Sequence, residues 1–247
     1  MPDSDAWLPY CGAAPVPAEW LGRWNLDPIL LLALALAIVL SLRQPGIGAR
    51  ERRFIAAVGG LTLLLFVSPF CALTSALFSA RAVHHLLLTA VLPPLIVVAC
   101  PHSPRLPGGV FPWTAVHAFI FWSWHVPEAY GWALSNDAVY WLMQASLLLS
   151  AVGLWSAVSR VSVTNAIAAL LGTMVQMGLL GALLTFAGSA LYAPHFIAPV
   201  AWGLSPLEDQ QLAGLIMWAP GAGIYLVAAL ALLARWFARE QPSALAG

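Results

Sequence analysis

The residues best suited to chemistry stand at the start of one long apolar stretch, "SARAVHHLLLTAVLPPLIVVAC", which covers positions 79–100. Arg81, His84 and His85 lie close together there, and no further charged residue follows in the stretch. Ionisable groups inside an apolar span are costly, and they usually face the interior of a helix bundle or a wet cavity. The three residues therefore indicate a topology signal, a proton or metal site, or ordinary packing.

Metal binding is the site chemistry that the available side chains suit best. Imidazole is a ligand for copper, zinc and iron, and thioether sulfur binds Cu(I). His84, His85 and His125 supply imidazoles, and Met143 or Met217 would add a sulfur. These residues make a candidate metal site if the fold brings them together.

Helix geometry separates the two adjacent histidines. On a helix Arg81, His85 and Leu88 share one face, whereas His84 is rotated by about 100° from His85. Both rings therefore cannot point straight into one pocket. We expect one of them to face the interior and the other to face a neighbouring helix or the headgroups.

Ordinary structural roles also explain these polar groups. A histidine at the end of a span commonly makes interfacial hydrogen bonds, and Arg81 can extend its stem to reach lipid headgroups. Cys11 and Cys71 could bind a metal or form a disulfide, and the sequence does not decide between these roles because neither cysteine lies in a CxxC motif. An aromatic belt at the membrane interface accounts for Trp122, Trp124, Trp132 and Trp141.

The composition places these residues in a membrane protein. The chain has 247 residues, of which 61% are hydrophobic and 8% charged, whereas about a quarter of the residues in a soluble domain are charged. Long Leu/Ala-rich segments without strict alternation predict membrane helices. We expect an all-α, polytopic bundle of about seven transmembrane helices at approximately 27–44, 53–72, 80–100, 112–127, 137–158, 163–187 and 207–236.

Arginine placement orients this bundle. Cytoplasmic connections of membrane proteins carry an excess of basic residues, and all ten basic residues here are arginine. Eight of them fall in alternate connections and at the C-terminal end: Arg43, Arg50, Arg52, Arg53, Arg105, Arg160, Arg235 and Arg239. We therefore expect the N-terminus outside and the C-terminus in the cytoplasm. The expected parts are an extracytoplasmic segment 1–26, a seven-helix membrane domain 27–237 and a short cytoplasmic tail 238–247.

Two further observations agree with this orientation. Eight of the ten acidic residues, among them Asp3, Asp5 and Asp137, fall at the opposite ends of the spans. The acidic N-terminus also lacks the basic region of a cleaved signal peptide, so we expect the first span to be retained.

With this topology the polar groups collect in one outer layer. The third span starts outside with His84 and His85, the fourth ends outside at His125, and His195 follows the sixth. Four of the six histidines therefore lie near the outer surface. The fifth span starts in the same layer and adds Tyr140, Met143 and Gln144.

The seventh span opens with a helix-start signal in "GLSPLEDQQLAGLIMW". Ser205 is a favourable N-cap, Pro206 fits the first helical position, and Glu208 stands where a capping box requires it. These three residues are expected to be structural. The signal leaves unexplained why Asp209 and the two following glutamines come together at the outer mouth of the bundle.

Several functional classes find no support in the sequence. The chain contains no GxSxG, HExxH or Walker motif, so we do not expect an enzyme. Its net charge is zero, and no stretch is basic enough to bind nucleic acid. Transporters often carry discontinuous helices at matching positions, which the sequence does not show. A haem held by facing axial histidines is awkward, because His85 and His117 lie at different depths.

Four segments appear in a recognisable order: "FSARAVHHLLLTAVLPPL", "FWSWHVPEAYGWAL", "GALLTFAGSALYAPH" and "GLSPLEDQQLAGLIMW". Together they resemble the CtaG family of cytochrome c oxidase assembly factors, which is linked to haem–copper oxidases of the caa type. The resemblance covers about residues 55–237, and its last segment is highly specific. It implies a multi-pass chaperone of the bacterial cytoplasmic (inner) membrane that works in respiratory chain biogenesis. Haem–copper oxidase subunits and membrane lipid are the implied partners.

Copper is the one cofactor that the resemblance suggests, in a role of delivery or insertion at the outer face. The positions matched to the family are His85, His125 and Asp209. With His84 and Met143 they form the candidate copper site.

The chain departs from the family pattern at two places. Where family members commonly carry a His-x-x-x-His pair on the third span, Arg81 precedes His85. Where they carry a second pair on the fifth span, Tyr140 and Gln144 stand. This loss of paired histidines keeps a second hypothesis open, a membrane scaffold for a nascent oxidase subunit that binds no metal. A small transporter or a haem redox protein is the third.

Overall fold

The computed structural model describes residues 9–100 and 107–244, with side chains up to residue 240. Asp3, Asp5 and Arg105, which entered the topology argument, lie outside the described residues. The fold is all-helical: 79% of it is helix, and the described residues contain no strand. The sequence prediction of an all-α fold is therefore confirmed.

Every one of the seven apolar segments forms helix. The third and seventh segments are each built from two α-helices joined by a π-helical turn, and short helices follow the second and fourth. The helices are α1 (Pro28–Leu42), α2 (Ala49–Phe66), α3 (Pro69–Ala76), α4 (Phe78–Leu86), η3 (Leu87–Val91), α5 (Leu92–Ala99), α6 (Val110–Trp124), α7 (Pro127–Ser135), α8 (Asp137–Val158), α9 (Val163–Thr185), α10 (Pro206–Ile216), η6 (Met217–Gly221) and α11 (Ala222–Ala244), with 3-10 turns η2 (Trp20–Gly22), η4 (Ala193–His195) and η5 (Ala198–Trp202).

Length and composition limit which helices can cross a membrane. Among the described residues four helical stretches qualify, and the pair α2 and α3, bent by 44°, would make a fifth. The other two, α1 and α6, have 15 residues each, and a span needs about 20. The four qualifying stretches are Phe78–Ala99, Asp137–Val158, Val163–Thr185 and Pro206–Glu240.

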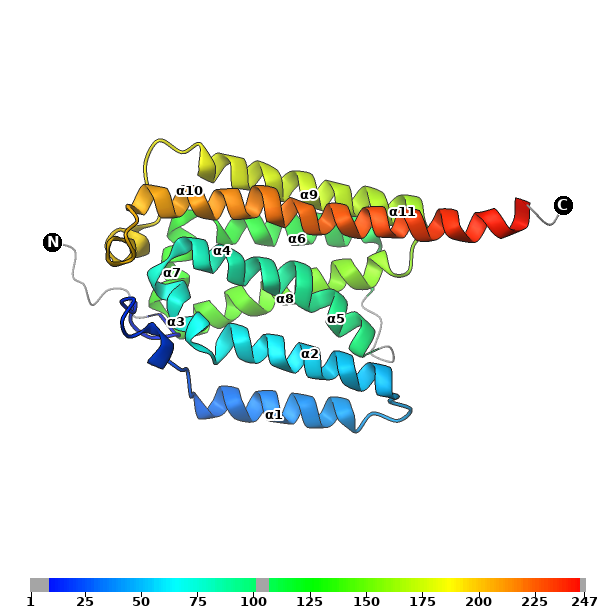
Figure 1. Ribbon diagram of the computed structural model, residues 1–247, viewed down its shortest axis with the longest axis horizontal. Coiled ribbons are helices and arrows are strands. Elements are labelled where there is room, and N and C mark those ends of the chain that lie inside the picture. The colour runs from blue at the N-terminus through cyan, green and yellow to red at the C-terminus, as the bar shows by residue number, and fades with distance from the viewer. Residues whose placement is uncertain (1–8, 101–106, 245–247) are drawn as a thin grey trace.

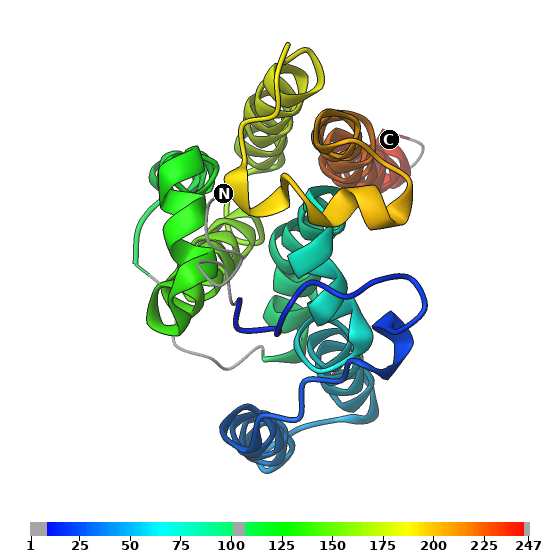
Figure 2. The ribbon, with the colours of Figure 1, turned by 90° about the vertical axis from the view of Figure 1, so that its left-hand side faces the viewer.

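The helices run side by side along one axis, and the stretch from α4 to α5 lies in the middle (Figure 1, Figure 2). It packs against α2, α8 and α10, while α6 and α9 complete the far side and α1 lies at the edge against α2. The central stretch is therefore surrounded by other helices, which explains why its polar side chains are buried.

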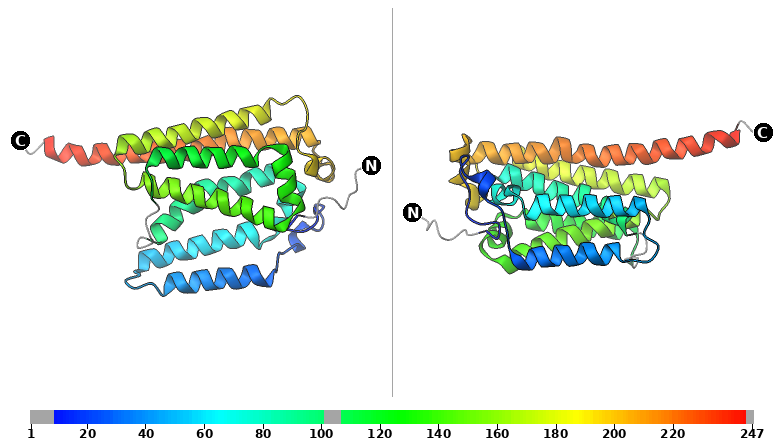
Figure 3. Two further views of the ribbon diagram at one scale, coloured as in Figure 1. Left: turned by 180° about the vertical axis from the view of Figure 1, so that it is seen from behind. Right: turned by 60° about the horizontal axis from the view of Figure 1, so that its bottom comes forward.

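The two ends of the bundle differ. One end, which we call the capped end, carries the N-terminal segment 9–26, the short helices α3 and α7, and the connection 187–205 (Figure 3). A disulfide joins Cys11 to Cys71 there, with 5.3 Å between their Cα atoms, which decides between the two roles left open for these cysteines. The opposite end carries the helix termini that bear Arg43, Arg50 and Arg160.

Prolines account for the two π-helical turns. Proline lacks an N–H, and its ring clashes with the carbonyl four residues earlier. Pro93 follows η3, and Pro220 lies inside η6. The carbonyl of Thr89, which Pro93 cannot bond, instead accepts a hydrogen bond from Trp155 Nε1 at 3.3 Å. Both helices remain continuous through these turns, unlike the broken helices of many transporters.

Candidate functional site

The polar layer predicted from the sequence lies inside the bundle, below the capped end. Its members come from four elements: α4 in the centre, the end of α6, the start of α8, and α10. The side chains that are buried there include Arg81, His84, His85, His125, Tyr140, Met143, Gln144 and Asp209. The sequence therefore located the layer, and the structure defines what each member does.

Asp209 caps the central helix. The residue before α4, Leu77, has no side chain that can bond the free N–H groups at the helix start, which need partners from elsewhere. The Asp209 carboxylate accepts from the backbone N–H of Phe78 at 2.6 Å, from that of Ser79 at 3.1 Å, and from the Ser79 hydroxyl. A negative charge also suits the positive end of the helix dipole. Its carboxylate is thus engaged in fixing α4 against α10.

The two neighbouring glutamines have similar structural roles. Gln210 bonds both ways with the connection after α9, accepting from Leu191 N–H at 2.7 Å and donating to the Ser189 carbonyl at 3.3 Å. Gln211 donates to the carbonyl of Ala187 at 3.5 Å. Their clustering with Asp209 therefore fastens α10 and its neighbouring loop to the rest of the bundle.

Arg81 is buried, with 1% of its surface exposed. The alternative that it reaches lipid headgroups is therefore wrong. Its guanidinium carbon lies 5.6 Å from the centre of the Tyr140 ring, within the range of a cation–π contact. None of its three side-chain nitrogens has a hydrogen-bond partner among the described residues. The Tyr130 and Tyr140 hydroxyls lie close to the guanidinium, so the charge sits among neutral polar groups and has no hydrogen-bonded acid among the described residues.

The adjacent histidines separate as helix geometry requires. His84 turns toward α2, where its Nε2 lies 3.2 Å from the Leu65 carbonyl oxygen and its ring meets Phe66 edge-on. His85 turns toward α6 and faces His125, with 6.0 Å between the ring centres. The Nε2 of His85 has no hydrogen-bond partner among the described residues. A neutral His125 would donate from Nδ1 to the Phe121 carbonyl oxygen at 2.6 Å, which leaves its Nε2 with the lone pair.

The structure brings together His85 and His125 from the candidate copper site. His84 lies beside them, but its Nε2 is within hydrogen-bond distance of a carbonyl of α2. The Asp209 carboxylate accepts hydrogen bonds from the start of α4. Met143 is fully buried on α8. Within the described part of the chain no three His, Cys, Asp or Glu side chains are placed to hold one metal ion. The donor set therefore suits at most a two-imidazole site, and the Arg81 charge one helical turn from His85 opposes cation binding.

Tyrosines and His195 close the layer from the capped end. Tyr130 and His195 Nε2 are 2.7 Å apart, and His195 Nδ1 lies 3.3 Å from the Ala76 carbonyl oxygen. Tyr192 donates to the His125 carbonyl at 2.8 Å. Burial lowers the pKa of His195 to about 3, so the ring is neutral at physiological pH. Tyr130 then donates to Nε2, and Nδ1 donates to Ala76.

The sequence did not assign these closing roles. The segment "ALYAPHF" contains both Tyr192 and His195, and it lies within one of the stretches that carried the family resemblance. The partners are 65 and 67 positions away in the chain, so no local pattern could have paired them.

Two of the four tryptophans of the predicted aromatic belt link helices inside the bundle. Trp122 Nε1 donates to Gln176 Oε1 at 2.8 Å, linking α6 to α9. Trp124 Nε1 donates to Ser146 Oγ at 2.9 Å, linking α6 to α8. Trp132 is 62% exposed, as a belt residue would be. The expectation of a simple interfacial belt is therefore too coarse.

Comparison with known proteins gives one family. The model of the family described as "Cytochrome c oxidase caa3 assembly factor (Caa3_CtaG)" matches residues 33–239. The matched region contains α2 to α10 in full, most of α1 and α11, and all the residues of the polar layer described above. Neither curated proteins nor solved structures gave a match.

Proposed function

The chain belongs to the cytochrome c oxidase caa3 assembly factor family, and from this membership we propose that it assists the assembly of a haem–copper oxidase at the outer face of the bacterial cytoplasmic membrane. The match over residues 33–239 is the observation that carries the proposal. The role is non-catalytic, with oxidase subunits and membrane lipid as partners. In a deletion strain we expect lower oxidase activity and lower copper content of the oxidase. Normal values of both would contradict the proposal.

The topology we propose has seven spans with the N-terminus outside. The extracytoplasmic segment is 1–26, the membrane domain 27–237 and the cytoplasmic tail 238–247. Arginines gather at one end of the bundle, and the disulfide lies at the other, as expected for an oxidising compartment. The short helices α1 and α6 would be accommodated by local thinning of the bilayer.

Cysteine labelling tests this topology. The disulfide lies at the capped end, and Cys100 is a free thiol after α5 at the opposite end. In intact cells a membrane-impermeant maleimide should leave Cys100 unlabelled until the membrane is permeabilised, whereas a cysteine placed at Ala13, which is exposed at the capped end, should be labelled at once. Labelling of Cys100 but not of the Ala13→Cys variant's new thiol in intact cells would reverse the orientation.

For the copper function we propose that His85 and His125 hold Cu(I) as cargo on its way to the oxidase. Imidazole nitrogen is a suitable copper ligand, and the two rings, one on α4 and one after α6, meet edge to face with 6.0 Å between their centres. The unbonded Nε2 of His85 is free to act as a ligand. Each helix would contribute one ligand, and the layer above would shield the ion from water.

A Cu(I) titration against a competing chelator tests the copper role. The double variant His85→Ala/His125→Ala should lose binding, whereas His117→Ala should retain it. His117 is a matched control because it is also a buried histidine, and its Nδ1 is engaged with Ser150 Oγ at 3.0 Å. Equal binding by both variants would place copper elsewhere or show that it binds non-specifically.

One observation favours a scaffold that binds no metal. Arg81 stands one turn before His85 with its guanidinium unpaired and buried, and a fixed positive charge repels Cu(I). In this case the protein would hold a client subunit through its apolar helix faces. Oxidase subunits should then co-purify equally with the native protein and with His85→Ala/His125→Ala. Loss of co-purification in that variant would contradict the scaffold.

A further inference from the structure

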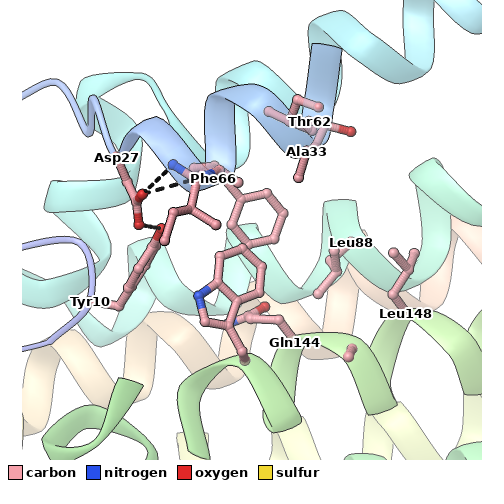
Figure 4. Close-up of a pocket in the computed structure, with 13 residues that line it drawn as sticks. Tyr10, Asp27, Ala33, Thr62, Phe66, Leu88, Gln144 and Leu148 are labelled. Atoms are coloured by element: carbon pink, nitrogen blue, oxygen red, sulfur yellow. Dashed lines mark hydrogen bonds between the residues drawn. The ribbon is translucent and has the colours of Figure 1, made fainter. Parts of the chain in front are cut away.

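A cavity of about 590 Å³ lies between α1, α2 and α8, and neither His85 nor His125 lines it. Figure 4 shows its lining, which is almost entirely apolar and includes Ala33, Phe66, Leu88 and Leu148. The volume falls within the range of about 300–1,000 Å³ that is usual for small-molecule sites. The cavity lies at the edge of the bundle, because α1 is the outermost helix there (Figure 2). An apolar molecule dissolved in the bilayer could reach this cavity from the side, and its volume and polarity would suit the lining.

Most polar groups around the cavity already have partners. Tyr10 donates to Asp27 at 2.5 Å, and Asp27 also accepts from the backbone N–H of Ile29 at 2.8 Å. The Thr62 hydroxyl donates to the Val58 carbonyl at 2.7 Å. These groups therefore close the polar edge of the cavity without needing a ligand.

Gln144 is the exception. Its side chain lines the cavity and is 2% exposed, yet neither its amide oxygen nor its amide nitrogen has a hydrogen-bond partner among the described residues. Buried polar atoms of this kind are rare, because each unmade hydrogen bond costs free energy. One amide presents an acceptor and a donor together. A hydroxyl group satisfies both at once, since it donates through its proton and accepts through its oxygen.

Charge selects against an anionic head group. Asp27 accepts hydrogen bonds at the same cavity, and these donors favour its ionised form. A carboxylate or phosphate placed beside Asp27 would be repelled by that charge. A neutral head group avoids both the repulsion and the cost of desolvating a charge.

We propose that this cavity binds a neutral single-chain lipid that carries a hydroxyl head, with its chain against α1 and α8 and its hydroxyl bonded to the Gln144 amide. Nothing in the proposal depends on copper or on the oxidase client. Gln144 belongs to the polar layer, but neither His85 nor His125 lines the cavity, so the lipid can bind whichever function the histidine pair serves. The occupant would also fill the space between α1 and the rest of the bundle.

Photolabelling of the full-length protein in phosphatidylcholine nanodiscs tests the proposal. The probe is hexadecanol with a diazirine in its chain, and its matched controls are the corresponding fatty acid at pH 8 and the corresponding hydrocarbon. We expect the alcohol to label peptides of α1 and α8, and excess unlabelled hexadecanol to prevent this. The fatty acid and the hydrocarbon should label these peptides several-fold less.

Two variants link the labelling to the cavity. Gln144→Leu removes the amide at similar volume and should lower the labelling about five- to tenfold, as expected for one or two lost hydrogen bonds. Ala33→Trp fills the cavity from α1 and should abolish the labelling even if Gln144→Leu folds poorly. Gln211→Leu is the control, because that amide is bonded outside the cavity. Equal labelling by all three probes, or unchanged labelling in Ala33→Trp, would show bulk lipid only and overturn the proposal.

Discussion

At the scale of single residues, Arg81 is a buried cation whose side-chain nitrogens have no hydrogen-bond partner among the described residues. A buried charge without an acid partner costs several kcal/mol, and Arg81 has the Tyr140 ring and the nearby Tyr130 and Tyr140 hydroxyls around it but no hydrogen-bonded acid among the described residues. Proteins retain such groups where function requires them, and stability then commonly rises when they are replaced. Arg81 is therefore a better marker of function in this chain than the histidines beside it.

Replacing Arg81 with methionine should stabilise the protein. The variant Arg81→Met keeps an unbranched apolar stem but removes the charge, so we expect an increase of about 1–4 kcal/mol in the free energy of unfolding. Thermal unfolding in detergent measures the change, and Arg23→Met, at an exposed position, is the control. Lower stability of Arg81→Met than of the control would mean that the guanidinium is paired in the native protein. Oxidase assembly should fall in Arg81→Met if the charge serves function.

The lowered pKa of His195 predicts that the stability of the protein depends on pH. Burial holds its pKa at about 3 in the folded protein, below the usual 6.5. The unfolded chain therefore binds a proton that the folded chain excludes, and the contribution of His195 is fully present above pH 6.5 and is lost as the pH falls toward 3. At pH 5 the loss amounts to about 2 kcal/mol.

The comparison of the native protein with His195→Gln isolates this contribution. Glutamine retains one acceptor for Tyr130 and one donor for the Ala76 carbonyl but does not titrate. Between pH 7.5 and pH 5 the melting temperature of the native protein should fall further than that of the variant. Parallel curves would mean that His195 is protonated in the folded state or is exposed to water.

At the scale of elements, α9 and α10 are in close contact where Gly181 of α9 meets Gly214 of α10. A Cβ atom at Gly181 would lie 2.7 Å from the carbonyl oxygen of Gly214 and 2.7 Å from the backbone nitrogen of Trp218. Backbone atoms cannot move aside as a flexible side chain can, so the two helices would have to separate. Close approach through small residues is a general way for membrane helices to pack.

Gly181→Ala should therefore destabilise the bundle, whereas Gly172→Ala on the same helix should not. The first change forces apart a packed crossing and should cost about 1–3 kcal/mol. The second adds a methyl group where nothing lies within 4 Å, and the higher helix propensity of alanine should make it neutral or stabilising by up to about 1 kcal/mol. Unfolding in detergent compares the two, and equal effects would contradict the close crossing.

The elements also show which parts of the fold the sequence could predict. Apolar length and composition located the seven long helical segments but not the short helices α3 and α7, because only a long segment must satisfy its own backbone groups across the apolar layer. The capping box at Ser205 and Glu208 could also be predicted, because its two partners are only three positions apart in the sequence. The π-helical turn before Pro93 and the capping of α4 by Asp209 depend on contacts between distant segments. Such contacts leave no local pattern.

In the candidate site, too, features set within one helix could be predicted from the sequence, and features set by packing between helices could not. Helix geometry separated His84 from His85, because both sit on one element and their directions follow from 100° per residue. That His85 would meet His125, and that Arg81 would have no acid partner, depends on how α4, α6 and α8 pack. The family resemblance supplied the matched positions, and only the packing shows that Asp209 holds a helix end.

At the scale of the whole molecule, the disulfide fastens the N-terminal segment to the bundle. It closes a loop between positions separated by 60 residues, and such a bond commonly contributes about 2–4 kcal/mol. The same segment supplies Tyr10, which packs between Tyr140 and Trp141 and bonds Asp27. The bond therefore supports both the polar layer and the cavity edge.

The double variant Cys11→Ser/Cys71→Ser should unfold at a lower temperature than the native protein. The native protein should also migrate faster on a non-reducing gel than on a reducing one, and the variant should show no such difference. Reductant should lower the melting temperature of the native protein to that of the variant. No response to reductant would mean that the two cysteines are not joined.

The position of this bond sets an order in time. Cys11 precedes α1, and Cys71 follows α2, so the helical hairpin between them separates the two thiols along the chain. In the proposed topology they can meet only after that hairpin has been inserted and both of its flanks have been exported. A newly made chain with the bond closed has therefore completed the insertion of its first hairpin. Closure of the bond therefore reports that this step of biogenesis is complete. Pulse-chase samples trapped with a thiol reagent would measure how long after synthesis the first hairpin is inserted in living cells.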